Sequence, residues 1–347
     1  MRNLVPAAVA ALTLTLAQLM FAAPAQAFDI EERRLFGSGD REIAVLSTTD
    51  LAAIDMVLQD FVDGHPDIRI RYDQASSMQV FGAIHDEGAI YDLVMSSAMD
   101  LQMKLANDGF AAPVLPRTGN LPLWARWRDQ LFGVALEPVV TLASRRGLGD
   151  LPVPRTRRDL IAMLREHPDL LGGRVATYDP VTSGVGYFLI AQDSQNFEGF
   201  WRLAEVMGRL NARLFCCSVE MIDELREGRI TIAYNVVASY AARYTPEDPD
   251  LIRLAFEDYT FAIVRSAFVP SNAHNAADAT TLLSYLLSGP AQRQIAANAG
   301  VALIPGTGPE PGPHLRPIRL DTGLLVYDDQ LRRAGLMAEW NAALVQP

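Results

Sequence analysis

The sequence has 347 residues, of which 30 are Lys or Arg and 41 are Asp or Glu, so its formal net charge is −11. An acidic chain of this kind is a poor partner for nucleic acids and for anionic membrane surfaces. Half of the residues are hydrophobic, and a chain of this length is expected to form two lobes rather than one small core.

Residues 1–27 have the pattern of a cleavable secretory signal peptide. Arg2 supplies the positive charge of the first segment, and an apolar stretch follows. Residues 25–27 form an A-x-A cleavage site, so the mature chain is expected to begin near Phe28. The small residues at that site argue against the alternative, an uncleaved membrane anchor. No later stretch of the sequence is long and apolar enough to span a bilayer. We therefore expect an exported protein in the periplasm of a Gram-negative cell.

The region after the expected signal peptide predicts a β-α-β-α-β arrangement. Apolar runs at 43–46, 68–72 and 91–95 are typical of buried strands, and each is followed by apolar residues at helical spacing. Hydroxyl side chains follow each strand directly: Ser47, Thr48 and Thr49, then Ser76 and Ser77, then Ser96 and Ser97. Parallel strands bring such turns to one edge of a sheet, where ligands bind and where helix starts attract anions.

The turn at Ser96 and Ser97 has two interpretations. Ser97 and Asp100 have the spacing of a capping box, so Ser97 could serve only to begin its helix. Taken alone, this interpretation is favoured. The recurrence of hydroxyl groups after three successive strands instead favours a site for a polar, anionic ligand.

Two extended apolar stretches are expected to cross between the lobes. Residues 132–142 leave the first lobe, and residues 259–269 return and carry Arg265, which we expect to pair with a nearby carboxylate. The expected first lobe comprises residues 28–137 and 261–310. The expected second lobe comprises residues 138–260 and 311–347, with a closing helix at 328–344.

The second lobe repeats the strand, hydroxyl turn and helix. A strand at 174–178 precedes Thr182, Ser183 and Gly184, although an ordinary turn is an equally good interpretation. Cys216 and Cys217 are adjacent in sequence; we expect two reduced thiols, because adjacent residues form only strained disulfides. Two cysteines alone do not make a zinc site.

Several stretches together resemble the periplasmic solute-binding proteins of ABC transporters, in the branch that includes ferric-ion binders, sugar-phosphate binders and binders associated with phosphoglycerate transport regulation. They are the turn at 47–49, YDLVMSSAMDLQMKLANDG, FGVALEPVV, SGVGY, VEMIDELREGRITIAYNVVASY, DYTFAIVRSAFVP and LLSGPAQRQIAANAG. The resemblance implies an α/β fold of type II, with two lobes, a ligand cleft between them and two crossing hinge strands. It also implies a membrane permease as partner, with a sensor kinase as the alternative.

The resemblance further implies which residues contact the ligand. They are the three hydroxyl turns of the first lobe, then Thr182, Ser183 and Gly184, the pair Tyr234 and Asn235 near the end of a strand at 230–237, and His274. Ferric binders of this branch use adjacent tyrosines near the end of that strand, and this chain has none there. We therefore expect a phosphorylated or carboxylated metabolite rather than ferric iron, with no cofactor and no metal.

A secreted serine hydrolase is the alternative from another class. A nucleophilic serine needs a base within hydrogen-bond reach. The five histidines are His65, His85, His167, His274 and His314, and only His274 falls near a plausible cleft turn. The sequence has no G-x-S-x-G elbow, so we predict a binding protein and not an enzyme.

Overall fold

A computed structural model of the chain describes residues 28–117, 119–244, 248–254, 256–299, 303 and 312–344. The expected signal peptide at 1–27 lies outside the described residues. Within these residues, no helix combines the length and the hydrophobicity that crossing a membrane requires.

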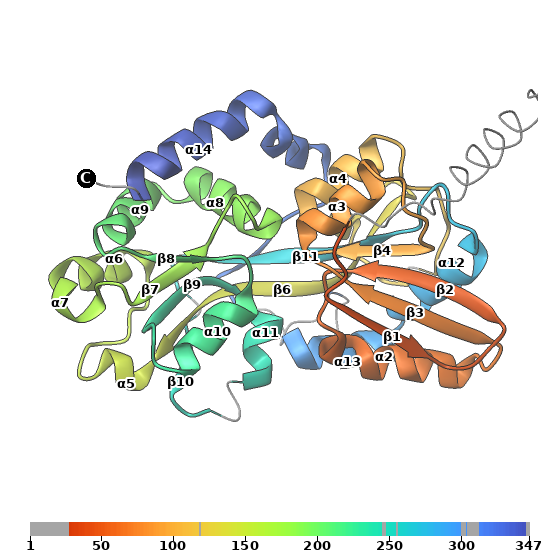
Figure 1. Cartoon of the computed structure of the whole chain (residues 1–347), viewed down its shortest axis with the longest axis horizontal. Coiled ribbons are helices and arrows are strands. Elements are labelled where there is room, and N and C mark those ends of the chain that lie inside the picture. Colours follow the sequence, from red (N-terminus) through yellow and green to blue (C-terminus); the bar gives the residue numbers. More distant parts are fainter. Residues whose placement is uncertain are drawn as a thin grey trace, which may run out of the picture.

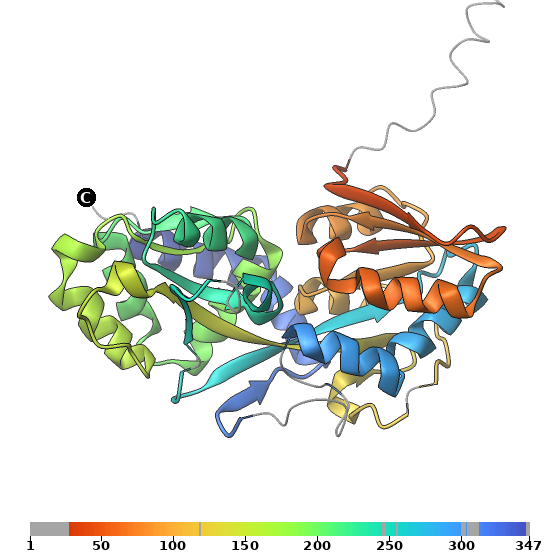
Figure 2. The same cartoon turned by 90° about the horizontal axis from the view of Figure 1, so that it is seen from below.

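The chain forms two α/β lobes joined by a pair of long strands (Figures 1 and 2). In the first lobe, three parallel strands lie side by side in the order β3, β2, β4, and β1 runs antiparallel along the outer edge of β3. The strands are β1 (Glu32–Phe36), β2 (Arg41–Ser47), β3 (Ile68–Gln74) and β4 (Leu93–Ser96). The β-α-β-α-β arrangement predicted from the sequence is therefore confirmed.

Helices follow each parallel strand of the first lobe and cover its sheet. They are α2 (Leu51–Gly64), α3 (Ser77–His85) and α4 (Met99–Asn107), joined later in the chain by α12 (Ala276–Leu286) and α13 (Gly289–Ala299). Helix α2 shows why the sequence folds this way. Leu51, Ile54, Leu58 and Phe61 recur at helical spacing, and all four are buried against the sheet.

The second lobe repeats the parallel arrangement on a smaller scale. Its parallel strands lie in the order β9, β7, β8, and they are β7 (Val175–Tyr178), β8 (Arg213–Phe215) and β9 (Ile232–Val237). The surrounding elements are α5 (Arg145–Leu148), α6 (Arg157–Glu166), α7 (Pro168–Leu171), α8 (Gly184–Asn196), α9 (Phe200–Arg209), α10 (Ser218–Arg226), α11 (Ala238–Tyr244) and β10 (Leu251–Leu254).

Two strands run through both lobes, as the sequence predicts. Strands β6 (Leu131–Ser144) and β11 (Thr260–Phe268) pair antiparallel with each other; β11 also pairs with β4 in the first lobe, and β6 pairs with β9 in the second. Every residue of both strands is buried. The short elements η2 (Leu123–Ala125) and β5 (Arg126–Trp127) lie before β6. Because β6 and β11 belong to both lobes, the exact lobe boundaries at 137/138 and 260/261 remain predictions.

The C-terminal segment contacts both lobes. Strand β12 (Leu315–Pro317) lies beside β11, the short helix η3 (Thr322–Asp328) packs against α4 of the first lobe, and α14 (Gln330–Leu344) packs against α9 of the second. In Figure 1, α14 runs above α8 and one of its ends lies beside α9. On α14, the ring of Trp340 stacks on Phe200 of α9 with 6.2 Å between ring centroids.

Candidate functional site

A cavity of about 500 Å³ lies between the two lobes. Its walls come from the turns that follow β2, β3 and β4 in the first lobe and β7, β8 and β9 in the second. The carboxyl ends of six parallel strands therefore meet around one cavity, which is where ligands bind in open α/β sheets.

Six of the hydroxyl residues predicted from the sequence line this cavity. They are Thr48, Ser76, Ser77 and Ser97 from the first lobe and Thr182 and Ser183 from the second. The structure thus brings together side chains that are up to 135 positions apart in the chain, counting from Thr48 to Ser183.

Three other predicted hydroxyl residues, Ser47, Thr49 and Ser96, lie behind the cavity wall, and the two serines hold their turns in shape. Ser47 Oγ accepts a hydrogen bond from the Thr49 N–H at 3.0 Å, and Ser96 Oγ accepts one from the Ala98 N–H at 3.2 Å. Both serines are buried, as is Thr49, and none of the three lines the cavity. The two serines support the backbone from which their neighbours face the cavity, whereas Thr49 Oγ1 has no hydrogen-bond partner among the described residues.

The predicted capping box at Ser97 and Asp100 is wrong. Helix α4 begins at Met99, and its cap residue is Ala98, which has no side chain able to accept a hydrogen bond from the helix start. Ser97 is instead held through its backbone, because its N–H donates to Thr48 Oγ1 at 3.3 Å. The Ser97 side chain is therefore available to the cavity that it lines.

The lobes touch each other directly at two helix starts. The N–H of Gly184, the first residue of α8, donates to Ser77 Oγ at the start of α3 over 3.1 Å. A β-carbon at Gly184 would lie 2.9 Å from that oxygen, so only glycine permits this close approach. Ser76 caps α3 by accepting from the Gln79 N–H, and Ser183 caps α8 by accepting from the Gly186 N–H.

The electrostatic character of the cavity is mixed. Its lining includes the carboxylates of Glu31, Glu32, Asp50 and Glu220, and among the described residues that line it none is Lys, Arg or His. Four helices, α2, α3, α8 and α10, begin at the cavity, and the dipole of a helix gives its start a partial positive charge that favours negative ligand groups.

A buried ion pair lies behind Thr48. Arg265 of β11 donates from Nε to Glu137 Oε1 of β6 at 2.6 Å and from Nη1 to Thr48 Oγ1 at 2.9 Å. Glu137 also accepts from Ser239 of the second lobe at 3.0 Å. Burial opposes the charge of Arg265, yet the Glu137 carboxylate keeps the pKa of the guanidinium raised. The expected pairing of Arg265 with a carboxylate is confirmed, and it links both crossing strands to the cavity wall.

Tyr234 and Asn235 do not line the cavity. Tyr234 donates to Asp193 Oδ2 at 2.8 Å and accepts from Arg157 Nε at 3.0 Å, and Asn235 Nδ2 donates to the same carboxylate oxygen at 2.8 Å. Tyr259 donates to the other oxygen of Asp193 at 2.9 Å. The structure therefore places these two residues in a buried network that holds the second lobe together.

Neither His274 nor Gly184 lines the cavity, although both were expected to contact the ligand. His274 is exposed and lies next to Asn275, whose side chain donates to the Glu42 carbonyl near the start of β2, at the edge of the sheet opposite the cavity. Gly184 contacts the opposite lobe rather than bordering the open volume.

Several residues that line the cavity were not singled out from the sequence. Tyr240 donates to the Thr48 carbonyl at 3.0 Å, and Tyr178 shares a hydrogen bond of 2.6 Å with Ser218. Burial raises the pKa of both phenols. Ser218 had a usable signal, since it follows a strand and begins a helix as the other hydroxyl turns do; the two tyrosines had none.

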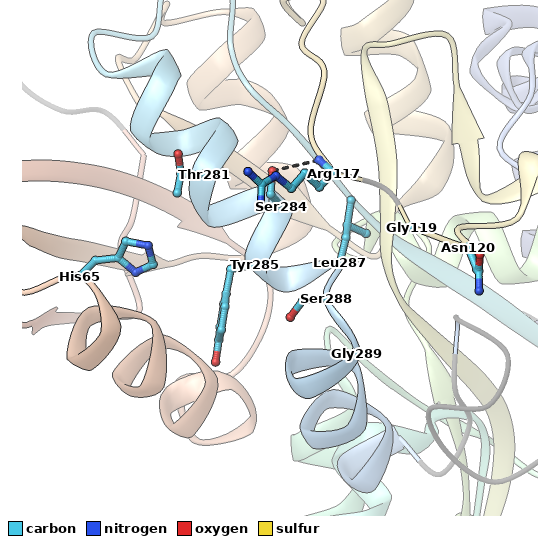
Figure 3. Close-up of a pocket in the computed structure, with 10 residues that line it drawn as sticks. All are labelled: His65, Arg117, Gly119, Asn120, Thr281, Ser284, Tyr285, Leu287, Ser288 and Gly289. Atoms are coloured by element: carbon cyan, nitrogen blue, oxygen red, sulfur yellow. Dashed lines mark hydrogen bonds between the residues drawn. The ribbon is translucent and has the colours of Figure 1, made fainter.

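A larger hollow of about 760 Å³ lies on the first lobe alone (Figure 3). Its lining comes from the end of α2, from Arg117, Gly119 and Asn120, and from the junction of α12 with α13. The Arg117 N–H donates to Ser284 Oγ at 3.1 Å, as Figure 3 shows. The described residues that border it include none of the predicted hydroxyl turns and none from the second lobe, so the interlobe cavity remains the candidate site.

Comparison with known proteins adds the following. The sequence model of the family described as bacterial extracellular solute-binding protein matches residues 43–300. The crystal structure of the substrate-binding protein of an ABC transporter from Agrobacterium tumefaciens has 30% sequence identity and a TM-score of 0.83, and the alignment covers 90% of this chain and 98% of that one. No curated protein matches the chain.

Two further solved structures share the fold. The periplasmic binding protein AfuA from Actinobacillus pleuropneumoniae, with fructose-6-phosphate bound, has 14% identity and a TM-score of 0.72 over 89% of this chain and 100% of that one. Iron-bound HitA from Pseudomonas aeruginosa has 16% identity and a TM-score of 0.66 over 87% and 99%. At these identities the likeness concerns architecture, and it agrees with the predicted two-lobe fold of type II.

Proposed function

Because the chain belongs to the bacterial extracellular solute-binding proteins and is the periplasmic binding component of an ABC transporter, we propose that it captures a small metabolite with a phosphate or carboxylate group. In this proposal, the metabolite binds in the interlobe cavity and is delivered to the membrane permease. One observation carries the proposal: the hydroxyls of Ser77, Ser97 and Ser183 and the starts of α3 and α8 converge on one cavity.

The chemistry of the wall supports an anionic group held by neutral donors. Backbone N–H groups at helix starts and serine hydroxyls both donate hydrogen bonds, and bonds to a charged acceptor are stronger than bonds between neutral groups. The four carboxylates of the wall favour hydrogen-bond donors on the rest of the ligand, such as hydroxyl or ammonium groups. This combination suits a polar metabolite better than a bare inorganic anion.

The cavity also supports binding rather than catalysis. Among the described residues that line it there is no histidine to activate Ser77, Ser97 or Ser183. Members of the family bind and release solutes, and we propose the same for this chain.

Replacing Ser97 by alanine should weaken ligand binding by roughly ten- to a hundred-fold, and replacing Ser183 by alanine should do the same. Each change removes one hydrogen-bond donor to a charged group. The two residues come from opposite lobes, so both should matter if both lobes hold the ligand. Native mass spectrometry of the purified protein would identify a co-purifying metabolite, and isothermal calorimetry with that metabolite would measure the effect.

Ser194→Ala is the matched control. Ser194 lies on α8, the helix that Ser183 caps, and its hydroxyl donates to the Ala191 carbonyl. Removing the Ser194 hydroxyl should leave the affinity for the ligand unchanged. Unchanged affinity in both Ser97→Ala and Ser183→Ala would place the ligand elsewhere.

Ferric citrate should not produce a visible phenolate-to-iron band with this protein. Tyr234 is engaged with Arg157 and Asp193, and the two cavity phenols, Tyr178 and Tyr240, have raised pKa values because they are buried. Iron held by phenolates needs the ionised form, which burial disfavours. A strong band that disappears in Tyr240→Phe would contradict the proposal and favour an iron-binding protein.

A further inference from the structure

One cluster in the cavity wall is not used by the anion site. It consists of Cys216, Cys217 and Glu220 on the second lobe, whose sulfur and carboxylate ligand atoms all lie within 4.8 Å of one another. The two sulfurs are 3.0 Å apart, and both cysteines are free thiols. All three residues line the interlobe cavity, so an ion could reach them from there.

The local fold explains why these three residues meet. Strand β8 ends at Phe215, and Cys217 has the extended conformation of the residue that caps α10. Glu220 lies three residues further on, in the first turn, so its carboxylate stands over the cap residue. Two thiols and a carboxylate are thereby placed on one side of a helix start.

The electrostatic setting prepares this cluster for a cation. Cys216 Sγ lies within hydrogen-bond distance of Cys217 Sγ, and the carboxylates of Glu220 and of Glu31 from the opposite lobe border the same cavity. A cation bound here would be attracted by these carboxylates, and no described Lys, Arg or His of the cavity lining competes with it.

The donor atoms decide which cation fits. Thiolate sulfur selects soft metal ions such as Zn²⁺, Cd²⁺ and Cu⁺, whereas Mg²⁺ and Ca²⁺ require oxygen ligands. Two sulfurs and one carboxylate oxygen give three protein ligands and leave room for water or a solute oxygen from the cavity.

We propose that Cys216, Cys217 and Glu220 form a binding site for a soft, thiophilic metal ion on the second-lobe wall of the interlobe cavity. Binding displaces the thiol protons, so metal affinity rises with pH. Glu31 faces the cluster from the first lobe, so a bound ion also favours the arrangement in which the lobes are in contact.

The test uses the mature protein, reduced with a phosphine, desalted without oxygen and titrated with Cd²⁺ as the sole added ligand. We expect one equivalent to bind, with a thiolate-to-metal absorption band in the ultraviolet, and Mg²⁺ to produce no response. Replacing both cysteines by serine should abolish the band. Glu220→Gln should weaken binding by roughly ten-fold or more, since even partners outside the ligand shell typically contribute that much.

Asp223→Asn is the matched control, because Asp223 is a carboxylate on the same helix outside the cluster. Its Cd²⁺ affinity should equal that of the wild-type protein. A band that persists in the double serine variant, or equal affinities for Glu220→Gln and Asp223→Asn, would overturn the proposal. The circular dichroism melting curve of the double serine variant should match that of the metal-free parent, which separates loss of the site from loss of the fold. Because no metabolite is present in this assay, its outcome is independent of the proposed anion site.

Discussion

Replacing Arg265 by leucine is expected to lower the free energy of unfolding by about 3–5 kcal/mol, because it leaves the Glu137 carboxylate buried without its cation. Both side chains are 3% exposed, so water cannot compensate for the lost partner. The same change removes the donor to Thr48 Oγ1, so ligand affinity should fall as well. Urea denaturation followed by circular dichroism would measure the first effect, and calorimetry the second.

The double variant Glu137→Leu, Arg265→Leu is the control that separates charge from packing. A buried ion pair often contributes little beyond an apolar pair of similar volume, so removing both charges should restore most of the lost stability. A loss below about 0.5 kcal/mol in the single variant, the range of ordinary surface substitutions, would contradict this account of the pair.

Replacing Asp100 by asparagine is expected to stabilise the protein at pH 8 and to change little at pH 4. Asp100 is 1% exposed, one of its carboxylate oxygens has no hydrogen-bond partner, and burial raises its pKa to about 7. The folded state therefore keeps a proton that the unfolded chain releases near pH 4. The free energy of unfolding of the wild-type protein should therefore fall, by at most roughly 4 kcal/mol, as pH rises from about 4 to about 7. Above that range it should stay level.

The charged groups around Asp100 come from the C-terminal segment. Asp328 of η3 raises the pKa of Asp100 further, and Arg333 of α14 lowers it. Unfolding curves at several pH values should show that asparagine at position 100 removes the slope between pH 4 and pH 7.

Asp108→Asn at the other end of α4 is the matched control. Its hydrogen bond with Lys104 lowers the pKa of Asp108, so this change should reduce stability above pH 4 rather than raise it. A stability difference between Asp100→Asn and the wild type that does not vary with pH would show that Asp100 is not the titrating group.

The strand, turn and helix units could be predicted because their signals are local. Apolar runs of strand formers followed by hydroxyls and helical spacing need no distant partner, and the structure has β2, β3, β4 and β7 at those places. The crossing strands were predictable for the same reason. The apolar run at 132–142, which is broken at Glu137 and Pro138, proves to pair with strands of both lobes.

The details of the turns depend on partners far away in sequence. Ser97 and Asp100 have the spacing of a capping box, yet contact with Thr48, 49 positions earlier, fixes the Ser97 backbone, and the helix begins later. Tyr234 and Asn235 end a strand near the cavity, but Asp193 and Arg157 hold them in the lobe interior. Neither partner could be assigned from spacing, because both lie on helices whose orientation only the packed lobe defines.

The C-terminal segment has a mechanical consequence. Its short helix η3 packs against α4 of the first lobe and also accepts a hydrogen bond from Tyr187 of α8 in the second lobe through the Tyr327 carbonyl, and α14 packs against α9 of the second lobe. Any rotation of the lobes about β6 and β11 moves these attachment points relative to each other. The segment therefore ties the two lobes together, and we expect it to restrict how far they swing apart and so the size of solute that can enter, whatever side chains line the cavity.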